Sequence, residues 1–358
     1  MKRYSWALAL LAVCGVFTVL SPQFLSPRNL SMLMIELSTT AVLALGMFLI
    51  ILPGHIDLSV GSGVGLIGGV ASVLVFHHQW PAPLAMALGF ALALAVWYAM
   101  GAVVVKEKIP AFIITLGGLL IFKGLFWLVI RSATVPVVAG GGANLYSALT
   151  TYYFPPWAGY LMAALVSSAA AFREWRAPGE PEKRFLKAFL TAQLFFLFVV
   201  VMNRFRGVPL PIVVLGLVTL AVVVLTEHTP FGRHLYAIGG NEEAALLSGI
   251  PVDKVVIQAF GIMGGLVALT GFMQTAYAGA STTTVGELME LDAIAACVMG
   301  GTSLKGGRGT AFGVLFGALI MTCLLNGMTL LAVSPEFKFI VRGAVLALAV
   351  WLDTRLSR

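Results

Sequence analysis

Few residues of this 358-residue sequence have the types and spacing that a catalytic centre requires. The stretch Gly301-Thr-Ser-Leu-Lys-Gly-Gly-Arg-Gly309 has the glycines of a phosphate-binding loop, but no serine or threonine follows its lysine. The sequence has no H-E-x-x-H or G-x-S-x-G motif, and its three cysteines lack metal-ligand spacing. We therefore predict that the chain is not an enzyme, has no metal site or cofactor of its own, and cannot hydrolyse ATP by itself.

Several ionisable residues lie within or beside long apolar stretches, where each needs a physical reason, and four of them are considered as candidates. Asp57 and Asp292 are near the ends of such stretches, and for both we favour helix capping over a role in a polar path. Glu36 and Lys123 lie deeper, where they either pair or line a cavity. The amide of Asn326 suits hydrogen bonds between helices or to a polar solute, the first being the commoner role.

A polar segment at 226–254 interrupts the apolar sequence and predicts a short helix. Asn241 is placed to cap this helix, Glu242 and Glu243 suit its positive end, and Gly249 can close it. A membrane protein has little need of an ordered helix outside the bilayer, so the segment is a candidate docking site for a soluble partner. Its candidate residues are Arg233, Gly239, Gly240, Asn241, Glu242, Glu243, Ala244, Ala245, Ser248 and Gly249.

The composition predicts that lipid surrounds most of the chain, since 59% of residues are hydrophobic and only 10% are charged. We expect an all-α integral membrane protein, a polytopic bundle of about ten to twelve transmembrane or re-entrant helices, forming a single domain over 1–358. The apolar runs are 6–21, 30–52, 56–76, 83–105, 109–130, 157–172, 185–202, 208–225, 255–277, 288–304, 309–333 and 337–352.

The net charge of +7 is explained by orientation in a membrane and not by nucleic-acid binding. With every run spanning and the N-terminus in the cytoplasm, most basic residues fall on the cytoplasmic side, and both termini lie there. The basic residues that fall outside are Arg28, Arg131, Arg204, Arg206 and Lys338.

Two glycine-rich segments, 57–62 and 300–307, have two interpretations of equal weight. Small residues let membrane helices pack closely, and they also permit broken or re-entrant helices that line a pathway. A short similarity between Ile56-Asp-Leu58 and Leu291-Asp-Ala293 suits an internal repeat without establishing one. The candidate pathway residues are Asp57, Ser59, Ser62, Asp292, Thr302, Ser303 and Asn326.

Several motifs together resemble the permease subunit of bacterial ABC importers for monosaccharides, the ribose/xylose/galactose group. They run in family order from about residue 30 to the C-terminus. The matching stretches are His55-Ile-Asp-Leu-Ser-Val-Gly-Ser62, Ile109-Pro-Ala-Phe-Ile-Ile-Thr-Leu-Gly117, Phe231-Gly-Arg-His-Leu-Tyr-Ala-Ile-Gly-Gly-Asn241 with Ser248-Gly-Ile250, Glu290-Leu-Asp-Ala-Ile-Ala-Ala-Cys297 and Asn326-Gly-Met328.

The resemblance implies a multi-pass protein of the bacterial cytoplasmic (inner) membrane, in contact with lipid, that imports a monosaccharide. It implies a cytoplasmic ABC ATPase that carries ATP and Mg²⁺ and couples to 226–254. It also implies an external sugar-binding protein and a second permease copy. An additional helix pair at 157–202, with a basic connector, resembles the D-xylose type.

Two other classes of function remain as alternatives. A proton-coupled secondary sugar transporter would need buried titratable residues, and the candidates are Asp57, Glu36 and Lys123. It would leave the docking helix unexplained. An integral membrane enzyme would need a nucleophile or metal constellation, which the sequence does not supply.

Overall fold

The computed structural model describes residues 5–140, 142–176, 178 and 180–356, and within them the chain is almost entirely helical. The helices are α1 (Ser5–Leu20), α2 (Pro27–Ile51), α3 (Val60–Phe76), α4 (Ala82–Lys106), α5 (Ala111–Ile130), α6 (Leu145–Thr151), α7 (Pro156–Arg176), α8 (Pro181–Asn203), α9 (Leu210–His228), α10 (Pro230–Gly240), α11 (Glu242–Leu247), α12 (Val252–Ala278), α13 (Met289–Met299), α14 (Ala311–Leu330) and α15 (Pro335–Leu356).

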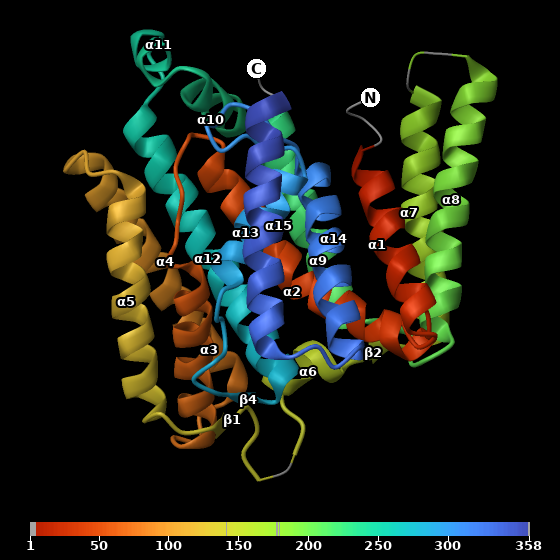
Figure 1. Ribbon diagram of the computed structural model, residues 1–358, viewed down its shortest axis with the longest axis horizontal. Coiled ribbons are helices and arrows are strands. Elements are labelled where there is room, and N and C mark those ends of the chain that lie inside the picture. Colours follow the sequence, from red (N-terminus) through yellow and green to blue (C-terminus); the bar gives the residue numbers. More distant parts are fainter. Residues whose placement is uncertain (1–4, 141, 177, 179, 357–358) are drawn as a thin grey trace.

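Two small antiparallel pairings join segments that are distant in the sequence. Strand β1 (Val135–Pro136) pairs with β4 (Ala280–Ser281), with Val135 opposite Ser281. Strand β2 (Tyr153–Phe154) pairs with β3 (Val208–Pro209), with Tyr153 opposite Pro209. Both pairings lie at the end of the bundle opposite α10 and α11 (Figure 1).

Seven helices in the described part of the chain are long and apolar enough to cross a membrane: α2, α4, α5, α8, α9, α12 and α14. The apolar parts of α1 and α3 are shorter. The predicted all-α polytopic membrane class is confirmed, and the larger predicted number also counted shorter apolar runs. The start of α1 and the end of α15 lie at the same end of the bundle as α10 and α11 (Figure 1). That this is the cytoplasmic end stays a prediction.

Helices α2 and α12 form the centre of the bundle. The most apolar windows of these helices are 83% and 72% buried, whereas that of α8 is 11% buried. Helix α12 packs against α2, α3 and α4, and α2 also packs against α13 and α14. The outer helices turn leucine and phenylalanine side chains outward, which suits a lipid surrounding. Helices α7 and α8 form an antiparallel pair (Figure 1), and α8 also contacts α2.

Two short helices begin inside the bundle instead of at its surface. After α2 ends, residues 52–59 lead back into the interior, where α3 starts. Helix α13 has 11 residues, so it is about 16 Å long and reaches only part of the way across a bilayer. Figure 1 shows α3 and α13 leading from the middle of the bundle toward opposite ends.

The starts of α3 and α13 meet through backbone. A Cβ atom added at Gly286 would collide with the carbonyl oxygen of Gly61, and one at Gly61 would lie 2.5 Å from the carbonyl oxygen of Gly286. Gly286 also has a φ of +84°, which favours glycine. The glycines at this contact therefore serve a close approach between two interrupted helices.

This contact predicts that Gly286→Ala destabilises the protein more than a glycine-to-alanine substitution elsewhere that has the same backbone strain but leaves free space around the added Cβ. Gly301 is the matched control, because its φ is +83° and nothing lies within 4 Å of an added Cβ. The strain of a left-handed alanine costs roughly 1–2 kcal/mol in both variants. Gly286→Ala adds the collision and should give a clearly lower Tm in detergent. Equal Tm values for the two variants would contradict the packing described here.

Candidate coupling and translocation sites

The polar segment folds into two consecutive capped helices. The Thr229 side chain accepts a hydrogen bond from the Gly232 amide at 3.4 Å, and Pro230 starts α10. The Asn241 side chain accepts one from the Ala244 amide at 2.9 Å and starts α11. The predicted cap is therefore present, and Gly249 follows α11 with a φ of +81°. The prediction missed α10, although a threonine before a proline is a helix-start signal.

Helix α11 projects from the end of the bundle (Figure 1). The side chains of Leu246 and Leu247 are 62% and 83% exposed, and Ala245 is the buried residue of the helix. Glu242 and Glu243 are also exposed. The helix thus presents adjacent leucines beside two acidic residues. The sequence analysis missed the leucines as contact residues, although a leucine pair in a polar segment was a visible signal.

The other residues predicted for coupling lie around α11. Arg233 and Gly240 are exposed on α10, and Ala244, Ser248 and Gly249 are exposed on and after α11. The Ser248 hydroxyl donates to the Ala244 carbonyl at 2.8 Å, so it closes the helix end. The structure therefore brings the residues predicted for coupling together at one end of the bundle. Gly239 and Ala245 lie on the side that faces the membrane helices.

Gly239 joins α10 to the two loops beneath it. A Cβ atom at this position would collide with the Leu52 carbonyl oxygen and the Gly307 amide. The Gly307 amide donates to the Leu52 carbonyl at 2.9 Å, and the Tyr236 hydroxyl donates to the Gly309 carbonyl at 2.9 Å. Helix α10 therefore rests on the loop that leads to α3 and on the loop that follows α13.

The charge of Glu242 also acts on the loop after α2. Burial lowers the pKa of His55 in this loop, and the Glu242 carboxylate acts in the opposite direction. The His55 ring lies 6.4 Å from the ring of Phe260, which lies more than two turns into α12. A change in the position of α11 therefore changes the electrostatic surroundings of a segment that leads into the bundle.

Asp57 is fully buried and anchors the start of α3. Its Oδ1 accepts hydrogen bonds from the Ser59 amide at 2.8 Å and the Ser59 hydroxyl at 2.6 Å. Its Oδ2 accepts one from the Trp97 indole at 2.7 Å, which ties α3 to α4. Asp57 therefore holds the N-cap residue Ser59 in place and is not itself the helix cap that the sequence favoured, and Asp292 lies in the first turn of α13 and pairs with Arg342. Ser62 lies one turn further along α3 and is partly buried.

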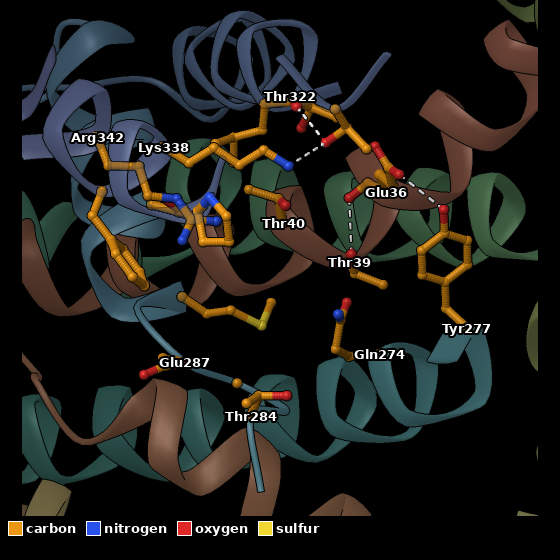
Figure 2. A pocket seen from close by; sticks show the side chains of 17 residues that line it. Glu36, Thr39, Thr40, Gln274, Tyr277, Thr284, Glu287, Thr322, Lys338 and Arg342 are labelled. Carbon is orange, nitrogen blue, oxygen red and sulfur yellow. Dashed lines mark hydrogen bonds and ion pairs between the residues drawn. The ribbon is translucent and has the colours of Figure 1, made fainter. Parts of the chain in front are cut away.

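A polar cavity of about 430 Å³ lies between α2, α12, α13, α14 and α15. Its lining includes residues from the last turns of α12 and the start of α15, and these ends of the two helices lie away from α10 and α11 (Figure 1). Figure 2 shows Arg342 and Lys338 at one side of the cavity and Glu36 and Tyr277 at the other, with Gln274 between them. The Arg342 guanidinium pairs with the Asp292 carboxylate at 3.2 Å.

A hydrogen-bond network fixes the Glu36 side of the cavity. The Glu36 carboxylate accepts from the Tyr277 hydroxyl at 2.8 Å and from the Asn326 amide at 3.2 Å. Asn326 in turn accepts from the Asn29 amide at 2.9 Å. Both oxygens of a carboxylate at membrane depth are thereby satisfied, which offsets the cost of its burial.

The predicted pathway residues do not form one group. Asp292 lines the cavity, and Asn326 reaches it through Glu36. Thr302 and Ser303 belong to the loop beneath α10, where the Ser303 amide donates to the Arg308 carbonyl at 3.0 Å. The sequence analysis left Glu36 out of the pathway set. The signal for it was an acidic residue within an apolar run.

Together, the helices, the polar cavity and the projecting helix define a multi-pass membrane protein of the transport class. Residues 29–350 match the family model described as "Branched-chain amino acid transport system / permease component". The chain belongs to this permease family.

Curated relatives align over nearly the whole chain. The xylose transport system permease protein XylH of Escherichia coli K12 is 38% identical, covering 98% of this chain and 91% of the relative. XylH of Haemophilus influenzae is 37% identical, covering 99% and 96%. The ribose import permease protein RbsC of E. coli K12 is 34% identical, covering 97% and 92%. No solved structure gave a significant match.

The contacts between α10 and the two loops predict different outcomes for substitutions at two neighbouring glycines. Gly239→Ala should separate α10 from the loops and break the hydrogen bond between Gly307 and Leu52. Hydrogen exchange at the Gly307 amide should then accelerate by tenfold or more, the equivalent of about 1.4 kcal/mol. Gly240→Ala is the control, since nothing lies within 4 Å of its added Cβ. Unchanged exchange in Gly239→Ala would show that this contact does not hold the loops.

Proposed function

We propose that this chain is the transmembrane subunit of an ATP-driven importer that passes a monosaccharide, D-xylose, from an external binding protein into the cytoplasm. The similarity to XylH and RbsC over nearly full length supports a monosaccharide, and the higher identity to XylH supports xylose. The protein is placed in the bacterial inner membrane. ATP and Mg²⁺ are bound by the partner ATPase.

The mechanism is supported chiefly by the position of α11, which projects from the bundle and follows α10, the helix whose backbone contacts two loops at Gly239. Exposed leucines suit an apolar groove on a soluble partner, and the flanking acidic residues suit basic groups at the rim of that groove. When ATP closes the ATPase dimer, α11 moves with the groove that holds it. Helix α10 transmits this motion through Gly239 to the loops that lead to α3 and α13.

A second permease copy completes the importer. The external binding protein selects the sugar and delivers it to the end of the bundle opposite α11. Helices α7 and α8 form the additional pair at 157–202 and contact the remaining bundle mainly through the α8 end. The pair therefore contributes membrane surface and not residues of the cavity.

A proton-coupled secondary transporter is the competing function. The candidate proton carriers Asp57 and Glu36 each have both carboxylate oxygens engaged in hydrogen bonds. Such fixed partners suit structural roles more than the repeated protonation that coupling requires. This competing function also assigns no role to the exposed leucines of α11.

Charge reversal on α11 tests its docking. The double substitution Glu242→Lys with Glu243→Lys should reduce co-purification of the ATPase by about tenfold, the equivalent of roughly 1.4 kcal/mol of binding free energy. The control is Glu107→Lys with Glu182→Lys, which makes the same net charge change at exposed residues of the same end. Equal co-purification of the two double variants, with both inserted in the membrane, would exclude α11 as the docking element.

The energy source is tested in sealed vesicles that contain the assembled importer. With ATP and the binding protein supplied, uptake of D-xylose should continue after an ionophore collapses the proton gradient. Non-hydrolysable ATP should stop the uptake, because the ATPase supplies the motion. Uptake that ends with the proton gradient and ignores ATP would favour the secondary transporter. D-Ribose, measured in parallel, decides between the two sugars of the named relatives.

A further inference from the structure

We infer that the cavity between α2, α12, α13, α14 and α15 binds the sugar in transit within a single protomer, through Asp292, Arg342 and Thr322. The inference rests on the proposed function for the class of solute. It adds a binding site to a subunit whose selectivity would otherwise be supplied entirely by the external binding protein. The site would receive a neutral, hydroxyl-rich ligand.

Three buried polar atoms on the lining residues have no hydrogen-bond partner within the described part of the chain. They are Asp292 Oδ1, Arg342 Nε and Thr322 Oγ1. A buried polar atom left without a partner costs about 1–3 kcal/mol, so such atoms usually mark a place where water or a ligand binds. They belong to residues of three different helices, α13, α14 and α15, that line the same cavity, so a ligand bound there would have to offer several donors and acceptors at once.

The chemistry of these three atoms suits a sugar. The Asp292 carboxylate is an acceptor, the Arg342 Nε–H is a donor, and the Thr322 hydroxyl is both. Each sugar hydroxyl can likewise donate and accept. Asp292 Oδ2 already pairs with Arg342, so these two charges offset each other. Lys338, Glu36 and Glu287 also line the cavity, so the choice of a sugar over an ionic solute rests on the proposed function.

The size and remaining lining of the cavity agree with this ligand. A volume of about 430 Å³ lies within the range of sites that hold small molecules. Met289 and Phe339 also line the cavity and offer apolar surface to the C–H face of a sugar ring. Glu36 is held by Tyr277 and Asn326, so this wall of the cavity is already shaped before a ligand enters.

The position of Asp292 gives a means of releasing the ligand. Asp292 lies in the first turn of α13, whereas Arg342 and Thr322 lie on α15 and α14. The other end of α13 leads into the loop that supports α10 through Gly306 and Gly307. A movement of α10 therefore shifts α13 and moves the Asp292 oxygens relative to the other two groups. The same movement that opens a path would thus weaken sugar binding.

Two threonines allow a matched test. Thr322→Val and Thr270→Val each remove a buried hydroxyl without a partner in the described chain, but only Thr322 is among the cavity-lining residues. Equilibrium binding of radiolabelled D-xylose is measured on the purified full-length permease in nanodiscs. Thr322→Val should weaken this binding about three- to tenfold, the effect of one neutral hydrogen bond. Thr270→Val should bind as the unmodified chain does.

A second measurement keeps the inference testable if Thr322→Val folds poorly. Gln274 lines the cavity, so the thiol of Gln274→Cys should react with a water-soluble methanethiosulfonate reagent. D-Xylose or D-ribose should slow this reaction in a saturable way, and the chain without the added cysteine gives the background. Absence of saturable binding together with absence of protection would overturn the inference. So would equal loss of binding in Thr322→Val and Thr270→Val.

The outcomes also separate this inference from the proposed function. If the assembled importer takes up a monosaccharide with ATP while Thr322→Val keeps full uptake and binding, the cavity inference fails and the proposed function stands. If the permease binds a sugar at this cavity but uptake follows the proton gradient, the cavity stands and the ATP-driven function fails.

Discussion

The structure depends on one constraint of the bilayer: an interrupted helix is tolerated only where protein surrounds the break. Helices α3 and α13 both begin inside the bundle, and their starts meet at Gly61 and Gly286. Asp57 supplies the polar partners at the start of α3, and Trp97 connects that start to α4. The central helices α2 and α12 enclose this region, which explains why their surfaces are so much more buried than those of the outer helices.

From this contact, a continuous series of neighbouring groups leads to both ends of the bundle. Toward α11, the loops that connect to α3 and α13 meet Gly239 through the backbone of Leu52 and Gly307. In the other direction, the first turn of α13 carries Asp292 into the cavity. Backbone contacts between glycines transmit displacement well, because no flexible side chain lies between the moving parts. The two loops share a support in α10, through which a displacement of one loop reaches the other.

The sequence predicted the class of fold and the α11 cap because both depend on local signals. Long apolar runs require lipid or burial, and Asn241 followed by two acidic residues is a helix start. The cavity was not predictable, since Glu36, Asp292 and Arg342 are far apart in the sequence and meet only through helix packing. The role of the 57–62 segment was left open for the same reason. Glycines there serve a break whose partner, Gly286, lies more than two hundred residues further along the chain.

The acidic residues at membrane depth in this bundle are held by specific partners. Glu36 and Asp57 are fixed by fully engaged carboxylates, and Asp292 is held by Arg342. Protonation of Glu36 or Asp57 would remove the charge that these hydrogen-bond donors stabilise and would weaken the bonds that hold each carboxylate. Helix α11 is exposed at one end of this bundle, where its leucines are accessible to a soluble partner.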